Sequence, residues 1–294
     1  MPGLEMVFRT LSAGRAARLV MVALCAVLLS GCASTSLTSM FAEEEAPVEE
    51  KSAAQLYAEG DTLLDEGEWK SAAEKFEEVD KNYPYSPEAR RAMVMSAYVK
   101  WKQGDHPKAV SAARRYLTLH PGTDEAPLAQ HIIASAYFER INSPDRDQSD
   151  TEKALNELEI LVRRYPDSSY APQARKRIKI ARDLLAAKEM QVGRYYLERE
   201  NYIAAINRFR TVVEKYQQTA HVKEALSRLT EAYMALGIKS EAQTAAAVLG
   251  HNYPESEWYD DAYALLQSDG LEPRADAGSW ISRQLQALQQ ASPL

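Results

Sequence analysis

The 294-residue chain predicts an all-α fold, a solenoid built from about five helix-turn-helix pairs. Three observations predict this fold. From about residue 53 onward, apolar residues recur every three or four residues, which is the spacing of one helix face. An aromatic residue or histidine followed by proline recurs as a helix stop, and an alanine recurs at a fixed distance before each stop. Recurrence of this kind is the signature of a repeat architecture.

The helix stops measure the repeats, because their second residues are 37, 45, 51 and 37 residues apart. Alanine stands 12 residues before the second residue of every stop, and mostly larger apolar residues stand 8 and 5 residues before it. These offsets differ by three or four, so they place all three positions on one helix face. The stops are Tyr83-Pro84, His120-Pro121, Tyr165-Pro166, Tyr216-Gln217 and Tyr253-Pro254. The expected core positions are Ala72, Ala109, Ala154, Ala205 and Ala242; Phe76, Ala113, Leu158, Phe209 and Ala246; and Val79, Tyr116, Leu161, Val212 and Leu249.

Two further positions predict where the helices begin and end. A hydroxyl residue follows every stop by two positions, and a Ser or Thr before a helix is typical of an N-cap. These residues are Ser86, Thr123, Ser168, Thr219 and Ser256. Glycine stands 17 residues before the end of three stops, where a left-handed turn between two helices is expected. These glycines are Gly67, Gly104 and Gly237.

Each unit resembles the tetratricopeptide repeat, which has about 34 residues. The first repeat fits that pattern best, with Leu56, Gly60, Leu63, Ala72, Phe76, Val79 and Pro84. The second repeat has Ala113 where an aromatic residue is usual, and the fourth has Gln217 in place of proline. We therefore expect a solenoid of about five degenerate tetratricopeptide repeats. The alternative is a generic helical bundle, which the matches in all five repeats disfavour.

The uneven spacings predict the domain organisation. The polar stretch 142–150 is expected to be a loop inside the third repeat, and Ser168 to about Arg199 one long helix. Repeats one to three then occupy residues 52–167. The long helix, repeats four and five and a capping helix from Trp258 to Gln267 occupy residues 168–267. Residues 268–294 are expected to form a weakly ordered tail, docked weakly or bound by a partner.

The first 31 residues have the pattern of a signal peptide. Arginines precede the apolar stretch Leu19–Leu29, which is too short to span a bilayer. The sequence Leu29-Ser30-Gly31-Cys32 then resembles a bacterial lipobox, which implies lipidation of Cys32, for instance by palmitate, and cleavage before it. Ala33 in place of aspartate implies sorting to the periplasmic face of the outer membrane. The alternative is an ordinary secretory signal with a chance cysteine.

Residues 32–51 are expected to form a flexible acidic tether, because they carry clustered glutamates and no apolar period. Docking by the acidic run is the other possible role. The net charge of −7 argues against a nucleic-acid partner and against electrostatic attraction to anionic lipids. Because Cys25 would be removed with the signal and Cys32 lipidated, no disulfide is expected in the mature chain.

No catalytic motif, metal-ligand spacing or phosphate-binding loop is recognisable in the sequence. The five histidines are scattered, and we expect neither enzymatic activity nor a cofactor. They are His106, His120, His131, His221 and His251.

The combination of lipobox, acidic tether, five repeats and long helix resembles the BamD family, the lipoprotein subunits of the outer-membrane β-barrel assembly machine. Local segments carry the same resemblance, over roughly residues 55 to 265. They are Gly67-Glu68-Trp69-Lys70-Ser71-Ala72, Pro144-Asp145-Arg146-Asp147, Arg164-Tyr165-Pro166-Asp167-Ser168-Ser169-Tyr170, Tyr195-Tyr196-Leu197-Glu198-Arg199 and Ala204-Ala205-Ile206-Asn207-Arg208.

The resemblance implies a non-enzymatic scaffold that is anchored by its lipid and works with other assembly lipoproteins. Its C-terminal repeats would dock on the periplasmic domain of the barrel-forming subunit. Its N-terminal repeats would receive unfolded outer-membrane proteins through their C-terminal strand. The residues expected at the docking contact are Arg208, Asn207 and Arg199, and Asp145, Arg146 and Asp147 are expected to form a recognition loop. A solvated helix charge is the competing interpretation of Arg208, and another periplasmic repeat lipoprotein adaptor, peptidoglycan-associated or division-linked, is the alternative function.

Overall fold

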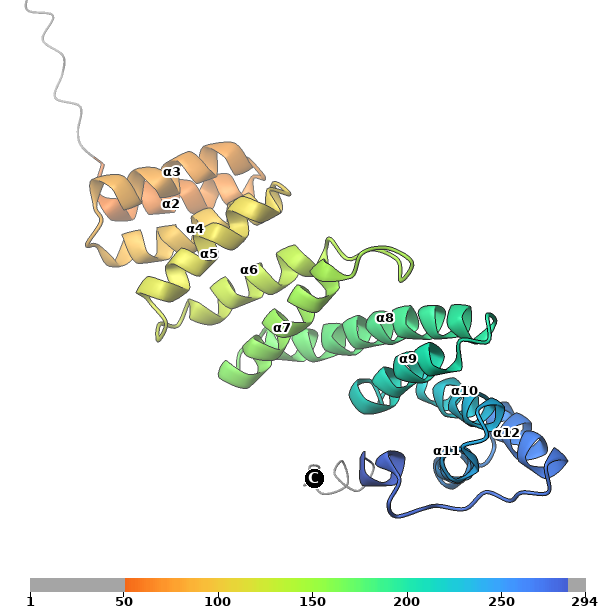
Figure 1. Ribbon diagram of the computed structural model, residues 1–294. Coiled ribbons are helices and arrows are strands. Elements are labelled where there is room, and N and C mark those ends of the chain that lie inside the picture. Colours follow the sequence, from red (N-terminus) through yellow and green to blue (C-terminus); the bar gives the residue numbers. More distant parts are fainter. Residues whose placement is uncertain (1–50, 285–294) are drawn as a thin grey trace, which may run out of the picture. The chain divides into compact units, whose positions relative to one another are not determined.

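The computed structural model describes residues 51–284 and is helical throughout its regular elements (Figure 1). The predicted signal peptide, Cys32 and nearly all of the predicted tether lie outside the described residues, as do residues 285–294. The helices are α2 (Ala53–Asp65), α3 (Trp69–Asn82), α4 (Pro87–Lys102), α5 (His106–Leu119), α6 (Ala126–Phe138), α7 (Ser149–Arg164), α8 (Ala171–Leu197), α9 (Tyr202–Lys215), α10 (Val222–Ala235), α11 (Lys239–Asn252) and α12 (Glu257–Ser268).

The helices pack in the order of the sequence, because each one contacts the next along the chain. The pairs α2/α3, α4/α5, α6/α7, α8/α9 and α10/α11 are the five predicted repeats, and α12 packs on α10 and α11 at the end. First helices of successive repeats also touch, α2 with α4 and α4 with α6. Packing restricted to near neighbours is the property of a solenoid. The predicted all-α solenoid of tetratricopeptide repeats is confirmed.

The core positions predicted from the helix stops are confirmed in every repeat. All fifteen side chains at these positions are fully buried. All of them except Ala154 belong to four apolar clusters along the chain, each built from consecutive helices. The small alanine of each repeat permits the two helices to approach, and the larger residues one and two turns later fill the space between them.

The predicted N-caps are right in only part of the chain. Ser86 caps α4 by accepting a hydrogen bond from the Ala89 backbone N–H at 3.0 Å. Ser256 occupies the N-cap position of α12 without a side-chain cap bond. The other three hydroxyls lie two residues before the cap and donate instead to the carbonyl of the first residue of the stop. These bonds join Thr123 to His120 at 3.1 Å, Ser168 to Tyr165 at 2.9 Å and Thr219 to Tyr216 at 2.7 Å.

Two extra turn residues separate these hydroxyls from their helices. Pro127 and Pro172 lie in the first turn of α6 and α8. Proline is well tolerated there because the first-turn N–H groups have no partner within the helix. A helix that starts just before such a proline leaves the hydroxyl to hold the turn.

The turn glycines behave as predicted. Gly67, Gly104 and Gly237 have φ angles of 81°, 78° and 73°, in the left-handed region. The fourth repeat has Glu200 at the equivalent position, and this residue also adopts a positive φ, of 58°. The turn geometry is therefore kept where glycine is absent, at the cost of a conformation that L residues disfavour.

The long helix expected from Ser168 to about Arg199 is α8, which has 27 residues. Its first half packs against α7 and its second half against α9. The predicted loop of the third repeat covers residues 139–148, so Ser149 and Asp150 belong to the first turn of α7 instead.

The expectation of a weakly ordered tail differs from the structure for residues 271–284. Ile281 is fully buried in the cluster that includes α9 to α12, and Leu271 and Trp280 pack against the same cluster. Trp280 and Ile281 make these contacts, although most other residues of the tail are polar. Leu285 and Leu288, further along the tail, lie outside the described residues.

Candidate functional site

One group of aromatic side chains comes from the first helices of three successive repeats. Trp101 near the end of α4 lies edge-on to Tyr98, with ring centroids 5.5 Å apart, and edge-on to His131 of α6, at 5.7 Å. His131 stacks on Tyr170, at the N-cap position of α8, with centroids 4.5 Å apart. We call these four rings the aromatic cluster. Edge-on and stacked pairs at such distances add to the stabilisation that burial provides.

Two cations border the aromatic cluster. Lys102 Nζ lies 4.7 Å from the ring centroid of Trp101. The Arg177 guanidinium of α8 donates to Ser135 Oγ at 2.7 Å and lies 4.8 Å from the ring centroid of Phe138. A cation over an aromatic face is attracted by the ring quadrupole. The two positive charges are thus held in fixed places beside the rings.

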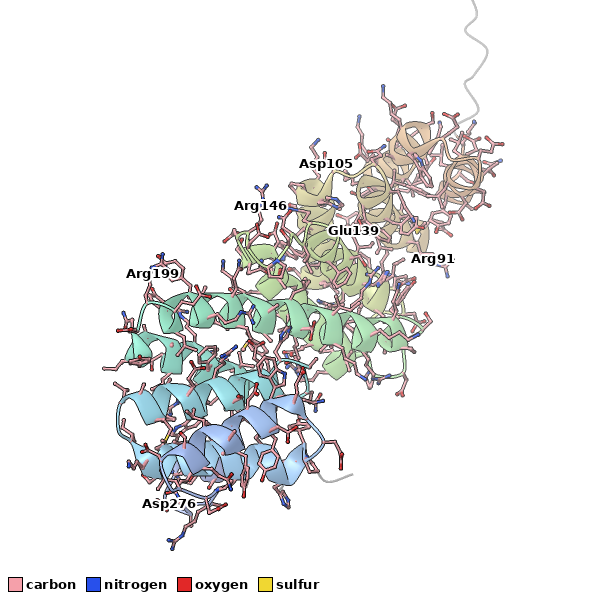
Figure 2. All side chains as sticks on the ribbon, turned by 90° about the vertical axis from the view of Figure 1, so that its right-hand side faces the viewer. Arg91, Asp105, Glu139, Arg146, Arg199 and Asp276 are labelled. Carbon is pink, nitrogen blue, oxygen red and sulfur yellow. The ribbon has the colours of Figure 1, made fainter. Side chains whose placement is uncertain are left out.

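The imidazole of His131 is neutral at neutral pH. Burial first, and then the charges of Arg177 and Lys102, lowers the pKa of His131 to about 4. The positive charge beside the cluster therefore rests on Lys102 and Arg177. Glu139, labelled in Figure 2, accepts a hydrogen bond from Trp101 Nε1 at 2.9 Å. Two cations and one carboxylate therefore lie beside the aromatic cluster.

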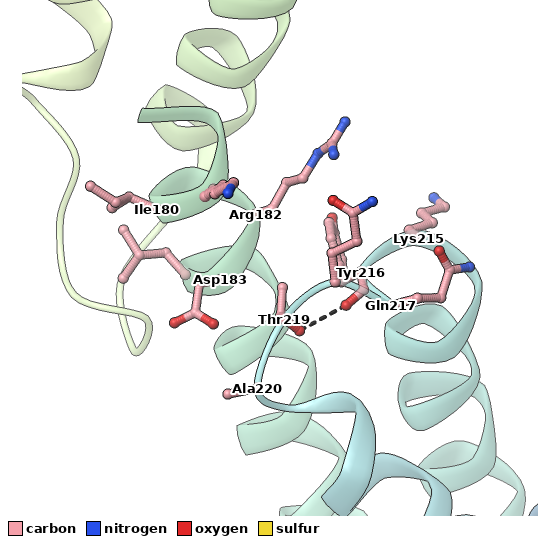
Figure 3. A pocket seen from close by; sticks show the side chains of 11 residues that line it. Ile180, Arg182, Asp183, Lys215, Tyr216, Gln217, Thr219 and Ala220 are labelled. Carbon is pink, nitrogen blue, oxygen red and sulfur yellow. Dashed lines mark hydrogen bonds between the residues drawn. The ribbon is translucent and has the colours of Figure 1, made fainter. Parts of the chain in front are cut away.

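A pocket of about 670 Å³ lies where α8 passes the loop between α9 and α10 (Figure 3). It arises because α9 has 14 residues and α8 has 27, so α9 runs along only the second half of α8. We call it the junction pocket, since it lies between the part of α8 that packs on α7 and the part that packs on α9. It is lined by Lys179, Ile180, Arg182, Asp183 and Leu184 of α8 and by residues 215–220.

The walls of the junction pocket are partly apolar and partly polar, and three of their four charged side chains are basic. Arg182 donates to Glu159 of α7 at 2.8 Å. Burial first, and then the nearby carboxylates of Glu189 and Glu152, raises the pKa of Tyr216 on the opposite wall. Figure 3 shows the bond that the Thr219 hydroxyl donates to the Tyr216 carbonyl, which fixes this wall. The mixed lining of the pocket suits a protein surface or a polypeptide segment.

Arg208, our main sequence-based candidate for a docking contact, forms an ion pair within the chain. Its Nη1 lies 3.2 Å from Glu189 Oε2 on α8, and its side chain is 45% exposed while that of Glu189 is 21% exposed. Asn207 beside it is exposed, and its carbonyl accepts a hydrogen bond from Thr211. The interpretation of Arg208 as a solvated helix charge is thus incomplete, because one face of the guanidinium is paired and the other is open.

Arg199 lies in the turn between α8 and α9, apart from this ion pair. Its guanidinium stacks on the ring of Tyr195, 3.7 Å from the centroid. Its hydrogen bond goes to the Tyr195 carbonyl at 3.5 Å and not to the Asn207 or Arg208 side chain. Figure 2 shows Arg199 on the same edge as Arg146 and Asp105, where the two helices of each repeat are connected.

The loop predicted to act in recognition is fixed by its own side chains. Asp147 accepts hydrogen bonds from the backbone N–H and hydroxyl of Ser149, at 3.2 and 2.5 Å, and so holds the start of α7. The Ser143 hydroxyl is the main cause of the lowered pKa of Asp145. Arg146 is exposed and forms no ion pair with any residue in the described part of the chain. All three predicted residues are exposed, and the two carboxylates accept hydrogen bonds from serines of the same segment.

The aromatic cluster and the junction pocket were not identifiable in the sequence as sites. The chain has 16 tyrosines, and their spacing within each helix does not separate helix packing from a binding groove. His131 and Trp101 are brought together by the packing of α4 on α6, which no local pattern encodes.

Within residues 51–284, no group of three or more His, Cys, Asp or Glu side chains is arranged to hold a metal ion. In the same range, none of the helices combines the length and apolar character that crossing a bilayer requires.

The model of the YfiO family, described as outer membrane lipoprotein, matches residues 49–249. An outer membrane protein assembly factor BamD from Caulobacter vibrioides is 41% identical, with 90% of this chain and 85% of that protein covered. The factor of the same name from Rickettsia prowazekii is 38% identical over 73% of this chain and 86% of its own length. That from Neisseria meningitidis serogroup A is 31% identical over 80% and 91%.

A solved tetratricopeptide-repeat protein of Thermus thermophilus is similar at 19% identity and a TM-score of 0.34, over 74% of this chain and all of that one. The family match spans more than half of the chain, and the relatives above exceed 30% identity over most of their own length. The chain therefore belongs to the YfiO family of outer membrane lipoproteins, together with the outer membrane protein assembly factors named BamD.

Proposed function

We propose that this chain is a non-enzymatic scaffold that helps to assemble β-barrel proteins in the outer membrane. Its relatives are named as outer membrane protein assembly factors, and it shares most of its length with them. The observation that carries the proposal is the aromatic cluster, in which rings from three separate repeats meet beside Lys102 and Arg177. A solenoid offers such an extended surface without needing a catalytic centre.

In this proposal the N-terminal repeats receive unfolded outer-membrane proteins at the aromatic cluster. The rings would stack on an aromatic side chain of the substrate's last strand, and Lys102 and Arg177 would attract its terminal carboxylate. Charge-assisted contacts of this kind are stronger than neutral ones. Main-chain and single-residue contacts of low specificity suit a scaffold that accepts many different substrates.

The barrel-forming subunit would dock through its periplasmic domain on the outer face of α9, near the junction pocket. Ile203 is 67% exposed and stands four residues before Asn207, so the two share one helix face. An exposed isoleucine beside Asn207 and the half-exposed Arg208 is a typical composition for a contact surface. Arg208 would then bind Glu189 and an acidic group of the partner at once. Other assembly lipoproteins are further proposed partners.

Exchanging the charges of the Arg208–Glu189 pair should separate docking from stability. In the variant Arg208→Glu with Glu189→Arg, the ion pair is restored in reverse, so the free energy of unfolding should change by less than about 1 kcal/mol. Co-purification of the barrel-forming subunit should fall about tenfold or more, because the exposed charge is inverted. The matched control reverses Lys239–Asp269, an exposed pair at 2.9 Å that joins the start of α11 to the end of α12. Normal co-purification by the first variant would limit Arg208 to a contact within the chain.

The lipid anchor proposed at Cys32 should determine where the protein lies. A Cys32→Ser variant should fold normally, because Cys32 precedes the helical region, and it should leave the outer-membrane fraction for the soluble periplasmic fraction. Anchoring of this type depends on acyl chains. Membrane fractionation by immunoblot, with circular dichroism of the purified variant, measures both effects. Retention in the outer membrane would mean that partner contacts suffice to hold the protein there.

Depleting the protein from the bacterium that carries it tests the function as a whole. Outer-membrane barrels should accumulate unfolded in the periplasm, where added protease degrades them, and their folded heat-resistant forms should decrease. Normal levels of folded barrels after depletion would contradict the proposal. Sedimentation with peptidoglycan, without a barrel-type protein as the main partner, would favour the alternative adaptor instead.

A further inference from the structure

The segment 271–284 follows α12, and residues 272–276 of it are held through their backbone. The Gln243 side-chain amide donates to the Glu272 carbonyl at 2.7 Å, and the Gln243 carbonyl accepts from the Arg274 N–H at 3.2 Å. The Thr244 hydroxyl accepts from the Asp276 N–H at 3.1 Å and lies 3.4 Å from the Arg274 carbonyl. Contacts to main-chain groups can be made by almost any sequence, as in other modes of extended-peptide recognition.

Two neighbouring side chains anchor the end of this segment. Trp280 Nε1 donates to the Tyr233 hydroxyl of α10 at 2.9 Å, and the Arg210 guanidinium of α9 lies 4.7 Å from the Trp280 ring centroid. Ile281 is fully buried, and the Ser279 hydroxyl donates to Glu241 of α11 at 2.6 Å. Three helices therefore form one receptor for an aromatic–aliphatic pair.

The residues between Leu271 and Ser279 have a defined conformation but bury little surface. Six of the seven residues from 272 to 278 are exposed, and the seventh, Pro273, is half-buried. Ordering such residues costs conformational entropy that burial does not offset. The solenoid already ends in α12, and residues 271–284 follow it. The tail is thus an attachment to the repeats, and segments of this kind open before the core does.

We propose that the surface of α9, α10 and α11 beneath residues 271–284 is a binding site for a partner polypeptide, occupied in cis by the chain's own tail. The partner segment would have an extended run followed by a turn that presents an aromatic–aliphatic pair, as Trp280-Ile281 does. The proposal rests on the tail contacts alone and is independent of the proposed function. A tethered segment competes with free ligands through its high effective concentration.

Peptide binding to the full chain tests this proposal. The release variant Trp280→Ala with Ile281→Ser removes both anchors, and the probe is a fluorescent peptide with the sequence of residues 270–284. By anisotropy, the release variant should bind the probe at least about tenfold more tightly than the wild type. A peptide of unrelated sequence that keeps the extended run and a Trp-Ile pair should compete, and the same peptide with Ser-Ser should not. Arg283→Ala, at an exposed tail position, is the matched control and should behave as the wild type.

Hydrogen exchange of the wild type provides a test that needs no variant. The amides of Arg274, Asp276 and Ile281 should exchange faster than the core amides of α10 and α11. Exchange of all these amides only by global unfolding would overturn the proposal, because the tail would then be an inseparable part of the core. Equal probe binding by a folded release variant and the wild type would also overturn it. So would a wild-type dimer that the unlabelled peptide dissociates, since the occupant would then be the tail of a second copy.

Discussion

Replacing Gly193 with alanine should destabilise the protein by about 1–3 kcal/mol, although the same change stabilises most helices. Gly193 lies in the second half of α8, where an added Cβ would stand 2.4 Å from the ring of Phe209. Phe209 is fully buried between α8 and α9, so its ring has no room to move away. Urea unfolding followed by circular dichroism measures the loss.

A double-mutant cycle with Phe209 separates this clash from the helix propensity of alanine. Phe209→Ala alone should cost about 3–5 kcal/mol, because it leaves a cavity in the core. In that background Gly193→Ala should recover about 1 kcal/mol, since the clash is gone and alanine favours the helix. In the second repeat the positions equivalent to Gly193 and Phe209 are both alanine, Ala97 and Ala113, and both are fully buried.

The first repeat provides an independent copy of the same pair. A Cβ on Gly60 would stand 2.7 Å from the ring of Phe76, so Gly60→Ala should be destabilising as well. If Gly193→Ala instead raises the free energy of unfolding in the wild-type background, the ring does not fix the separation of the two helices. The pairing of glycine with phenylalanine would then have no energetic meaning.

The positions along each repeat could be predicted from the sequence because they depend on local spacing. Alanines such as Ala72 and Ala205, the apolar residues that follow them and the turn glycines are set by the helix period and by backbone conformation. Both are properties of neighbouring residues. The length of α8 followed from the same reasoning, because no helix breaker interrupts it except Gly193.

The contacts between repeats could not be predicted in this way. The packing role of Gly193 depends on Phe209, which lies on another helix. The aromatic cluster depends on three helices that meet, and the buried tail depends on Ile281 finding a site between α9 and α11. Pairings of residues on separate helices are set by tertiary packing, and a single sequence carries no local signal for them.

Acidification should destabilise the protein through His131, by about 2 kcal/mol between pH 7 and pH 5. The folded-state pKa is lowered to about 4, chiefly by burial, and the unfolded value is 6.5. As the pH falls below 6.5, His131 binds a proton in the unfolded chain but not in the folded chain. The unfolded state therefore becomes more stable relative to the folded state. The contribution of neutral His131 to the free energy of unfolding is complete above pH 6.5. It is lost progressively down to about pH 4, where the loss reaches about 3 kcal/mol.

The variant His131→Phe isolates this effect, because phenylalanine can stack on Tyr170 and does not titrate. Guanidinium unfolding of both proteins from pH 7 to pH 5 should show a steeper loss for the wild type, while other titrating groups affect both equally. Protonation below pH 5 would also add a third positive charge beside Lys102 and Arg177, whose repulsion should loosen the aromatic cluster. Parallel stability curves for the two proteins would mean that the imidazole is hydrated in the folded state.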